Sequence, residues 1–421
     1  MKTRIPKLSP PDISLRPDDR VMEIRRYKLI TPLFGGGVEA QRADPITIIR
    51  GASVRGQLRF WWRATHGGQF NGNLKDMRAR ENAIWGSAAK KEEMNGGPSK
   101  VTLTTKNLIE GKPFAAVDNR GQPVTNLGDQ RSVYSYVAFP LREAQGAKAI
   151  EGIEFELMLR YPQEIEADVQ AALWAWQTFG GIGGRTRRGF GALQLTHVNG
   201  NVVQLPTSTH LQAEIRNGFR QHVVSGKRFR GGSFLEPDDV VVVAKSKKND
   251  AIQTWQYLFD RLKKFRQDRY DKNGQPYGRS KWPEPDAIRR LTKKHSRGHE
   301  PKHSVDGKFP RAQFGLPIIF QFKESDEKMG DPPAMTLIPR DAERWASPLI
   351  LRPIACSDGS IGLAVRLDSS LNDVERGIVL EGKDKRSYPA EWELSEQEAS
   401  QIEPLHGEPD VIQAFLENLK R

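Results

Sequence analysis

Apolar residues recur at two different spacings in the first half of the chain. Over residues 54–66 and 168–179 they return every three or four positions, as on one face of an amphipathic helix. Shorter segments with many β-branched and aromatic residues are typical of strands, and these are 21–33, 101–105, 153–161 and 191–198. The predicted order over about residues 20–205 is strand, helix, strand, strand, helix, strand, with an irregular insertion near 106–150. This is the order of a ferredoxin-like βαββαβ unit.

The second half shows a looser version of the same pattern. The predicted elements are a strand at 240–244, a helix at 252–266 and strands at 317–322, 349–354 and 361–366. We therefore predict an α+β fold with two ferredoxin-like (RRM-like) domains in tandem and irregular insertions. The predicted divisions are an N-terminal arm (1–20), a first domain with a glycine-rich loop (21–205) and a second domain (206–421).

The composition fits two globular domains without a membrane span. The chain has 421 residues, of which 37% are hydrophobic and 28% are charged. The single cysteine, Cys356, allows neither an intramolecular disulfide nor a cysteine-built zinc site. No apolar run follows the first basic residues, and no run reaches the length of a membrane helix. We expect a cytoplasmic protein without membrane contact.

The charge of the chain indicates a polyanionic partner. The net charge is +13 and the sequence pI is about 9.7, which favours nucleic acid. Residues 263–311 hold 15 Lys or Arg against 6 Asp or Glu, and the insertion 267–311 within them would suit a polyanion. Residues 368–421 hold 6 Lys or Arg against 13 Asp or Glu, so this acidic C-terminal region is expected to face solvent or a protein.

The loop of residues 180–191 is the strongest candidate for a binding site. Six of its twelve residues are glycine, which permits positive φ angles and close approach of another molecule to the main chain. Exposed backbone N–H groups together with Arg185, Arg187 and Arg188 would bind phosphates, and Phe190 could stack on a base. The loop follows a helix and precedes a strand, and it lacks the Lys-Ser/Thr of a P-loop. A nucleotide cofactor is therefore not expected, and the alternative is a glycine-rich hairpin with solvated arginines.

The predicted helix 54–66 is the second candidate. Ser53 is its expected N-cap, and Trp61 is expected to pack in the core. Helical spacing places Arg55, Arg59 and Arg63 together on another face, and arginine is well suited to bidentate phosphate contact.

Catalytic and metal sites are weaker hypotheses. His295, His299 and His303 have a spacing that could gather a metal, but Gly298 and Pro301 interrupt any helix there. His66 could act as a general acid or base in RNA cleavage, although a structural or phosphate-contacting role is favoured. Because no carboxylate pair suggests a two-metal nuclease, we expect no metal, no cofactor and no enzymatic activity.

With these residues in hand, the sequence resembles the RAMP superfamily of CRISPR systems. More narrowly it resembles the Cmr1-type subunit family of the type III-B effector, the Cmr complex. The matching segments cover about residues 24–366, and they are TPL at 31–33 with GGG at 35–37, SVRGQLRFWWR at 53–63, IWGS at 84–87 after Glu81, the glycine-rich loop, FGLPI at 314–318 and WASPL at 345–349.

The resemblance implies a fold and a function. Such subunits carry two ferredoxin-like domains and sit at one end of a ribonucleoprotein. There they contact the 3′ part of the guide RNA and the guide–target duplex, while other subunits cut. The resemblance implies an RNA-binding role for matching residues of the loop and for Arg55 and Arg59. The expected RNA-binding residues are Arg50, Arg55, Arg59, Arg63, Gly183, Gly184, Arg185, Arg187, Arg188, Gly189, Phe190 and Gly191.

We therefore predict a non-catalytic RNA-binding subunit of a type III-B CRISPR effector. The expected partners are guide RNA, target RNA and other Cmr subunits, including backbone RAMP subunits, with no small-molecule substrate. Two alternatives remain open. One is a metal-independent endoribonuclease that processes guide RNA precursors, and the other is a protein-interaction subunit with incidental RNA affinity.

Overall fold

The chain folds as a mixed α/β protein built on antiparallel sheets. The computed structural model describes residues 19–421 except 40, 45, 89–96, 143–146, 272–277, 323–329 and 370–376. The described strands form sheets of five, four, three and two strands. None of the helices over the described residues is long and apolar enough to cross a bilayer.

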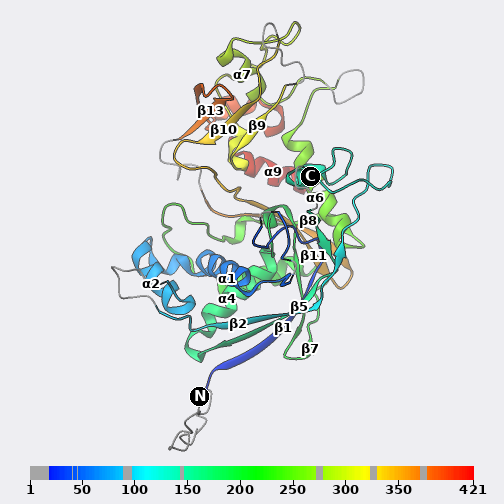
Figure 1. The fold of residues 1–421 in the computed structure, drawn as a ribbon. Coiled ribbons are helices and arrows are strands. Elements are labelled where there is room, and N and C mark those ends of the chain that lie inside the picture. Colours follow the sequence, from blue (N-terminus) through cyan, green and yellow to red (C-terminus); the bar gives the residue numbers. More distant parts are fainter. Residues whose placement is uncertain are drawn as a thin grey trace, which may run out of the picture.

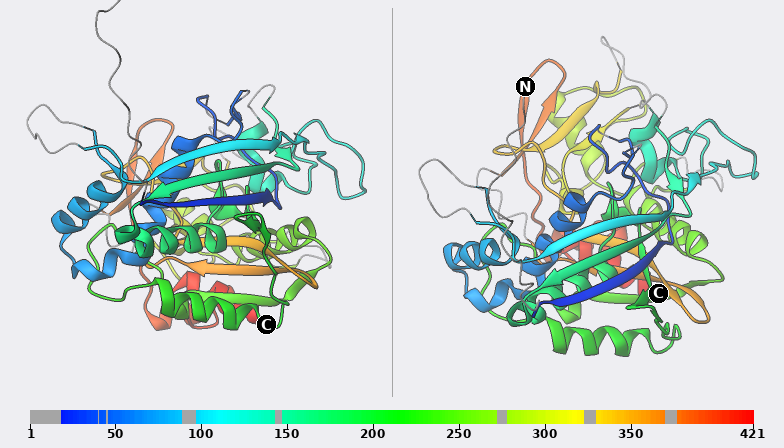
Figure 2. Two further views of the ribbon diagram at one scale, coloured as in Figure 1. Left: turned by 90° about the horizontal axis from the view of Figure 1, so that it is seen from below. Right: turned by 60° about the horizontal axis from the view of Figure 1, so that its bottom comes forward.

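The first half is built on the five-stranded sheet, in the order β2-β5-β1-β6-β7 with all neighbours antiparallel. Helix α1 follows β1 and α4 follows β5, and Figures 1 and 2 show both on the same side of the sheet. The predicted elements of this half are thus confirmed, in the order of a βαββαβ unit. Their bounds are β1 Val21–Leu29, α1 Gly51–His66, α2 Leu74–Trp85, β2 Thr102–Ile109, β5 Glu154–Tyr161, α4 Glu166–Phe179, β6 Leu193–Val198 and β7 Asn201–Val202.

Alternation along β1 explains how the sheet meets its helices. Tyr27 and Leu29 are buried, and Tyr27 packs against Phe155 of β5 and Trp176 of α4. Trp61 of α1 is 2% exposed, so its predicted core role is confirmed. The predicted N-cap is wrong, because α1 begins at Gly51 and is preceded by an extended Arg50 with no side-chain cap.

The insertion after β2 forms a small satellite core. It contains β3 (Lys112–Pro113), α3 (Ser135–Ala138) and β4 (Ile150–Glu151). Tyr134 from this insertion stacks on Trp255 of the second half at a ring separation of 5.3 Å. The insertion therefore joins the two halves rather than projecting alone.

The second half contains a three-stranded sheet in the order β11-β12-β8. Its elements are β8 (Val240–Lys248), α6 (Ala251–Arg266), β11 (Leu349–Cys356) and β12 (Gly359–Arg366), preceded in the chain by α5 (Leu211–His222). The buried Arg352 of β11 donates to the carbonyl oxygens of Gln177, Gly180 and Leu193 at 2.9, 2.6 and 2.8 Å. This side chain ties β11 to the end of α4 and the start of β6.

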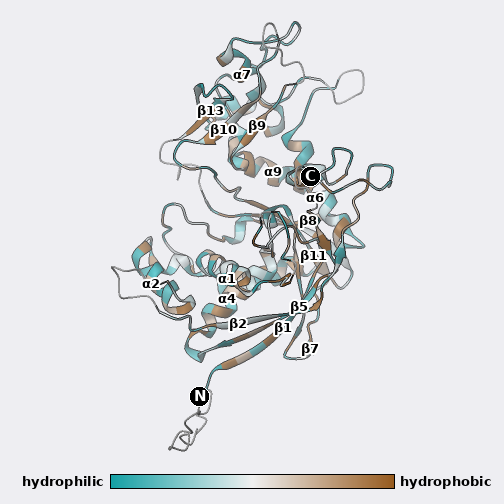
Figure 3. Ribbon diagram, viewed as in Figure 1, coloured by the Kyte–Doolittle hydropathy of each residue, from teal (hydrophilic) through white to brown (hydrophobic). Residues whose placement is uncertain are grey.

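A separate four-stranded sheet, in the order β14-β13-β10-β9, lies away from the five-stranded sheet (Figure 1). The segment predicted as a strand at 317–322 forms β9 (Ile318–Phe320), which pairs with β10 and not with the sheet of β8. Figure 3 shows hydrophobic positions in brown on β11 and on the strands of the first sheet. The remaining elements are α7 Glu284–Thr292, β10 Met335–Pro339, β13 Ile378–Gly382, β14 Ser387–Ala390, α8 Glu396–Ser400 and α9 Val411–Lys420.

Candidate nucleic-acid interface

The glycine-rich loop connects α4 to β6, and the segment after β1 holds it in place. The hydroxyl of Thr31 donates to Gly189 O (2.6 Å) and accepts from the N–H of Ala192 (2.8 Å). The N–H of Gly184 donates to Phe34 O at 2.6 Å. The N–H groups of residues 182, 184, 188, 189 and 191 all donate within the protein. These five N–H groups are therefore already bonded and cannot take part in the expected phosphate cradle.

The loop glycines serve packing more than ligand approach. Gly183, Gly189 and Gly191 have φ angles of +84°, +82° and +60°. A Cβ on Gly189 would lie 2.6 Å from the indole of Trp255, and one on Gly191 would lie 2.0 Å from the carbonyl oxygen of Ile182. Gly189 and Gly191 are buried, so the prediction that they touch RNA is wrong, whereas it stays a prediction for the half-buried Gly183 and Gly184.

The three loop arginines lie at the seam between the two halves. Arg188 donates to the carbonyl oxygen of Leu349 at 3.1 Å, and Arg187 donates to that of Ser347. Arg185 adopts a left-handed conformation (φ 56°), and its guanidinium carbon lies 5.0 Å from the centre of the Phe139 ring. All three side chains are thus half-buried on protein surface rather than fully solvated.

Arg266, at the end of α6, completes what we call the arginine cluster: Arg185, Arg187, Arg188 and Arg266. Arg266 donates to the hydroxyl of Tyr136 at 3.1 Å. Burial lowers the pKa of Arg188 to about 9, and the nearby guanidinium of Arg266 adds to this effect. Burial likewise lowers the pKa values of Arg185 and Arg187 to about 10.

Among the described residues, no carboxylate forms an ion pair with any member of the arginine cluster. Nε of Arg185 and Nε of Arg266 are buried without a hydrogen-bond partner. Four close, half-buried guanidinium groups repel one another unless an anion joins them. The arrangement suits a phosphate group, which accepts bidentate hydrogen bonds from arginine.

The aromatic residue beside the cluster is not the predicted one. Phe190 is 0% exposed, with ring centres 5.3 Å from Phe34 and 4.8 Å from Trp255, so the prediction that it stacks on a base is wrong. Phe139 is 53% exposed and lies under Arg185. Nothing in the sequence distinguished Phe139 or Arg266, because both approach the loop only through the tertiary fold.

The arginines of α1 are positioned by a carboxylate that sequence analysis had not paired with them. Oε1 of Glu81, which is 4% exposed on α2, accepts from Nε of Arg59 at 2.7 Å and from Arg63 at 2.6 Å. The face of α1 is therefore partly neutralised. Arg55 and Arg50 lie near the start of the same helix, and Arg50 interacts electrostatically with Asp44.

The glycine-rich loop meets α1 in two places, and at one of them a Cβ on Gly180 would lie 2.5 Å from Nε1 of Trp61. The guanidinium carbon of Arg187 lies 5.8 Å from the ring centre of Phe60, the neighbour of Arg59 on α1. The arginine cluster and the arginines of α1 are thus adjacent. RNA contact by Arg50, Arg55, Arg59 and Arg63 stays a prediction.

The histidines considered in the sequence have separate partners in the structure. The ring of His66 stacks on Trp62, and burial lowers its pKa. His299 pairs with Asp331 at 2.8 Å, whereas Nδ1 of His303 accepts from the N–H of Val305. In the described part of the chain, no group of three metal-ligating side chains comes together.

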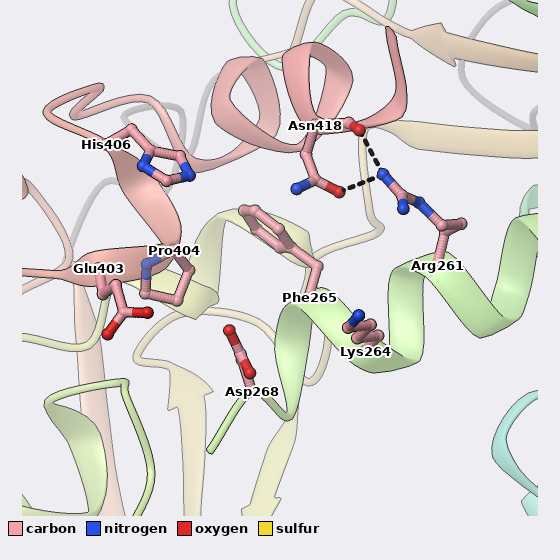
Figure 4. A pocket seen from close by; sticks show the side chains of 8 residues that line it. All are labelled: Arg261, Lys264, Phe265, Asp268, Glu403, Pro404, His406 and Asn418. Atoms are coloured by element: carbon pink, nitrogen blue, oxygen red, sulfur yellow. Dashed lines mark hydrogen bonds between the residues drawn. The ribbon is translucent and has the colours of Figure 1, made fainter. Parts of the chain in front are cut away.

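A cavity elsewhere has mixed charge. It lies between α6 and the C-terminal segment, and Figure 4 shows Asp268 and Glu403 among its lining side chains. Its Arg261 donates to the main-chain and side-chain oxygens of Asn418. With carboxylates present and its arginine already bonded, this cavity is less suited to a polyanion than the arginine cluster.

Comparisons with known proteins identify the first half of the chain. Residues 26–194 match the model of the RAMP superfamily. The Cmr subunit Cmr1-2 of Pyrococcus furiosus is 26% identical over 184 residues, which cover 39% of this chain and 90% of the relative. Cmr1-1 of the same organism is 26% identical over 160 residues, which cover 37% of this chain and less than half, 43%, of the relative.

Solved structures with similarity include Cmr1 from Pyrococcus furiosus in its apo form, at 15% identity and a TM-score of 0.46. That match covers 83% of this chain and 88% of the other. A chain of the type III-B Cmr-β complex bound to cognate target RNA matches at 12% identity and a TM-score of 0.48, over 94% of this chain and all of the other. Residues 26–194 of this protein match the RAMP superfamily, and the chain is similar to Cmr1 subunits.

Proposed function

We propose that this chain is a non-catalytic RNA-binding subunit of a type III-B CRISPR effector, the Cmr complex. In this role it contacts the 3′ part of the guide RNA and the guide–target duplex, beside other Cmr subunits. The similarity to two Cmr1 subunits and the RAMP match over residues 26–194 support the assignment. RNA is the partner because the arginine cluster offers four guanidinium groups without a carboxylate among the described residues.

The two halves are proposed to be related ferredoxin-like domains, 21–205 and 206–421, after an arm at 1–20. The order β11-β12-β8 in the second half matches β2-β5-β1 in the first. Helix α6 follows β8 as α1 follows β1, and α9 follows β12 as α4 follows β5. Helix α7 with β9 and β10 would then be an insertion between α6 and β11, and β13, β14 and α8 would be a second insertion between β12 and α9.

The arginine cluster is the observation that carries the RNA-binding proposal. Desolvated guanidinium groups retain strong electrostatic attraction for phosphate, because little water screens them. The cluster is built from residues of both halves, so it would fix the RNA backbone at their junction. Contacts of this kind do not depend on base identity, as a subunit that accepts many guide sequences requires.

The test is photo-crosslinking of a guide RNA with 4-thiouridine in the assembled complex, followed by mass spectrometry of the crosslinked peptides. We expect crosslinks in the peptides that contain Phe139 or residues 185–188. Crosslinks confined to other parts of this chain, or none to it, would contradict the proposal. The same complex is incubated with precursor RNA in EDTA, where cleavage that disappears in His66→Ala would instead establish an endoribonuclease.

A further inference from the structure

A basic cavity lies beside the arginines of α1. Its volume is about 430 Å³, and it lies between α1, α2 and the segment 229–231. The side chains that matter for its chemistry are Arg59, Arg63, Arg78, Arg230, Glu81 and Phe229. Neither Arg78 nor the 229–231 segment was singled out from the sequence.

The third wall of this cavity is held firmly against the end of α1. The N–H of Val224 donates to Thr65 O at 2.8 Å, and the N–H of Leu235 donates to Ala64 O at 3.1 Å. The two segments touch at glycines, since a Cβ on Gly226 would lie 2.0 Å from the carbonyl oxygen of Gly68. Capping the last turn of α1 in this way positions the 229–231 segment beside the helix.

The cavity carries an excess of positive charge. Among the described residues, four arginines line it against one carboxylate, Glu81, which is 4% exposed, and of these arginines Arg230 has a further partner of its own. A guanidinium has five N–H donors. Arg59 uses donors on Glu81 and on Gly86 O, while Arg63 uses one on Glu81. Both side chains remain about one-third exposed, so Glu81 orients their remaining donors beside the cavity without satisfying them.

We propose that this cavity binds a nucleotide of single-stranded RNA that continues from the arginine cluster along α1. The arginines would hold its phosphate, and the ring of Phe229 with the 39% exposed side chain of Leu74 would offer an apolar surface to its base. A concave site of this size admits a splayed nucleotide, whereas the convex backbone of a duplex would meet only its rim.

The path between the two sites is short and continuous. Arg187 of the cluster lies against Phe60, which directly follows Arg59, and Arg63 lies about one turn further along α1. Each step of four residues along a helix advances about 6 Å. The inference rests on the proposed RNA-binding function and extends it to a second binding position for the same strand.

The experiment compares four full-length proteins by fluorescence anisotropy with a labelled oligoadenylate of about 20 nucleotides. They are the wild type, Arg78→Gln/Arg230→Gln, the cluster variant Arg185→Gln/Arg187→Gln/Arg188→Gln, and the combination. We expect the Arg78/Arg230 change to weaken binding roughly tenfold and to lower the salt slope by about 0.7 for each phosphate that the variant no longer neutralises. In the combination, the remaining binding should fall further still.

The matched control is Arg216→Gln/Arg220→Gln, which removes two exposed arginines from α5. It should change affinity and slope much less. Unchanged binding in Arg78→Gln/Arg230→Gln, in both backgrounds, overturns the cavity proposal, while a loss in the cluster variant leaves the proposed function standing. If Arg78→Gln/Arg230→Gln binds RNA normally but fails to enter the assembled complex, the cavity receives an acidic protein, which also overturns the inference.

Discussion

The two basic regions of this protein, the insertion 267–311 and the arginine cluster, differ in whether their arginines have carboxylate partners. In the described part of the insertion, Arg289 pairs with Asp286 and Asp331, and Arg311 pairs with Glu284 at 2.9 Å. Those carboxylates are at most 6% exposed. In the arginine cluster, the described residues provide no such partner. The insertion has the higher net charge in sequence, yet its best-placed arginines are already occupied by protein.

The pKa shifts express the same difference. Burial lowers the pKa of Arg289, but its hydrogen bonds and charge interactions with Asp331 and Asp286 together more than offset this, so the net shift is upward. For Arg188, burial and a neighbouring guanidinium act together and the pKa falls to about 9. Ion pairs with carboxylates therefore give the arginines of the insertion a structural role. The arginines of the cluster have no carboxylate partner among the described residues, so an anion would stabilise them. The sequence-based expectation was that the insertion suits a polyanion. For these paired arginines the structure shows carboxylate partners within the protein instead.

The largest expected effect is on the stability of the insertion. Asp286 accepts from Arg279, Arg289 and the N–H of Lys302 and His303. Asp286→Asn should lower the free energy of unfolding by about 3 kcal/mol, because a neutral amide loses the charge and half of the acceptor oxygens that these four donors share. Urea unfolding followed by tryptophan fluorescence measures this.

Arg188→Gln is the comparison variant in the same unfolding assay. It removes a charge with no carboxylate partner among the described residues, so a loss below about 1 kcal/mol is expected. If the two variants lost equal stability, the contrast between paired and unpaired arginines would not hold.

A smaller effect is expected from the exposed aromatic at the cluster. Phe139→Ala should weaken binding of single-stranded RNA about tenfold, because a base stacked on an aromatic ring contributes about 1–3 kcal/mol. Tyr270→Ala is the matched control, since Tyr270 is 46% exposed but belongs to the insertion. Equal losses in the two variants, measured by anisotropy, would show that Phe139 has no special role.

The smallest effect is a dependence on pH. The arginines of the cluster have pKa values lowered to about 9 and 10, so the folded protein loses their charge as pH rises through that range. Affinity for oligoadenylate should fall as the pH rises above about 9, by less than the change expected for Phe139→Ala. Adenine bases lose no proton there, unlike uracil and guanine. An affinity that stays constant up to about pH 11 would contradict the lowered pKa values of these arginines.

The elements of the first half could be predicted because their signal is local. Burial of one helix face and alternation along β1 follow from the residues themselves, as with Tyr27 and Trp61. The sheet of β9 could not be predicted, since a strand of three residues carries no information about its neighbour.

The candidate site was predictable only in outline. The glycine-rich loop indicated the correct place. The sequence alone could not show that Phe190 is buried and Phe139 is exposed, because both are phenylalanines. The pairing of Arg59 with Glu81 and of Arg289 with Asp331 likewise depends on tertiary contacts between separate segments. Net charge over residues 263–311 therefore overestimated the charge that the insertion has available for a polyanion, and it did not distinguish Arg266 from its neighbours.

The most direct test of the central claim removes three charges from each region. The cluster variant Arg185→Gln/Arg187→Gln/Arg188→Gln is compared with Lys294→Gln/Arg297→Gln/Lys302→Gln, which alters exposed residues of the insertion. Anisotropy with single-stranded RNA over a salt series gives affinity and slope for each. We predict that the cluster variant loses about 100-fold in affinity and about two units of slope, while the insertion variant changes less than about threefold. Equal losses in the two variants would contradict this prediction, because RNA would then respond to net charge and not to the unpaired arginines.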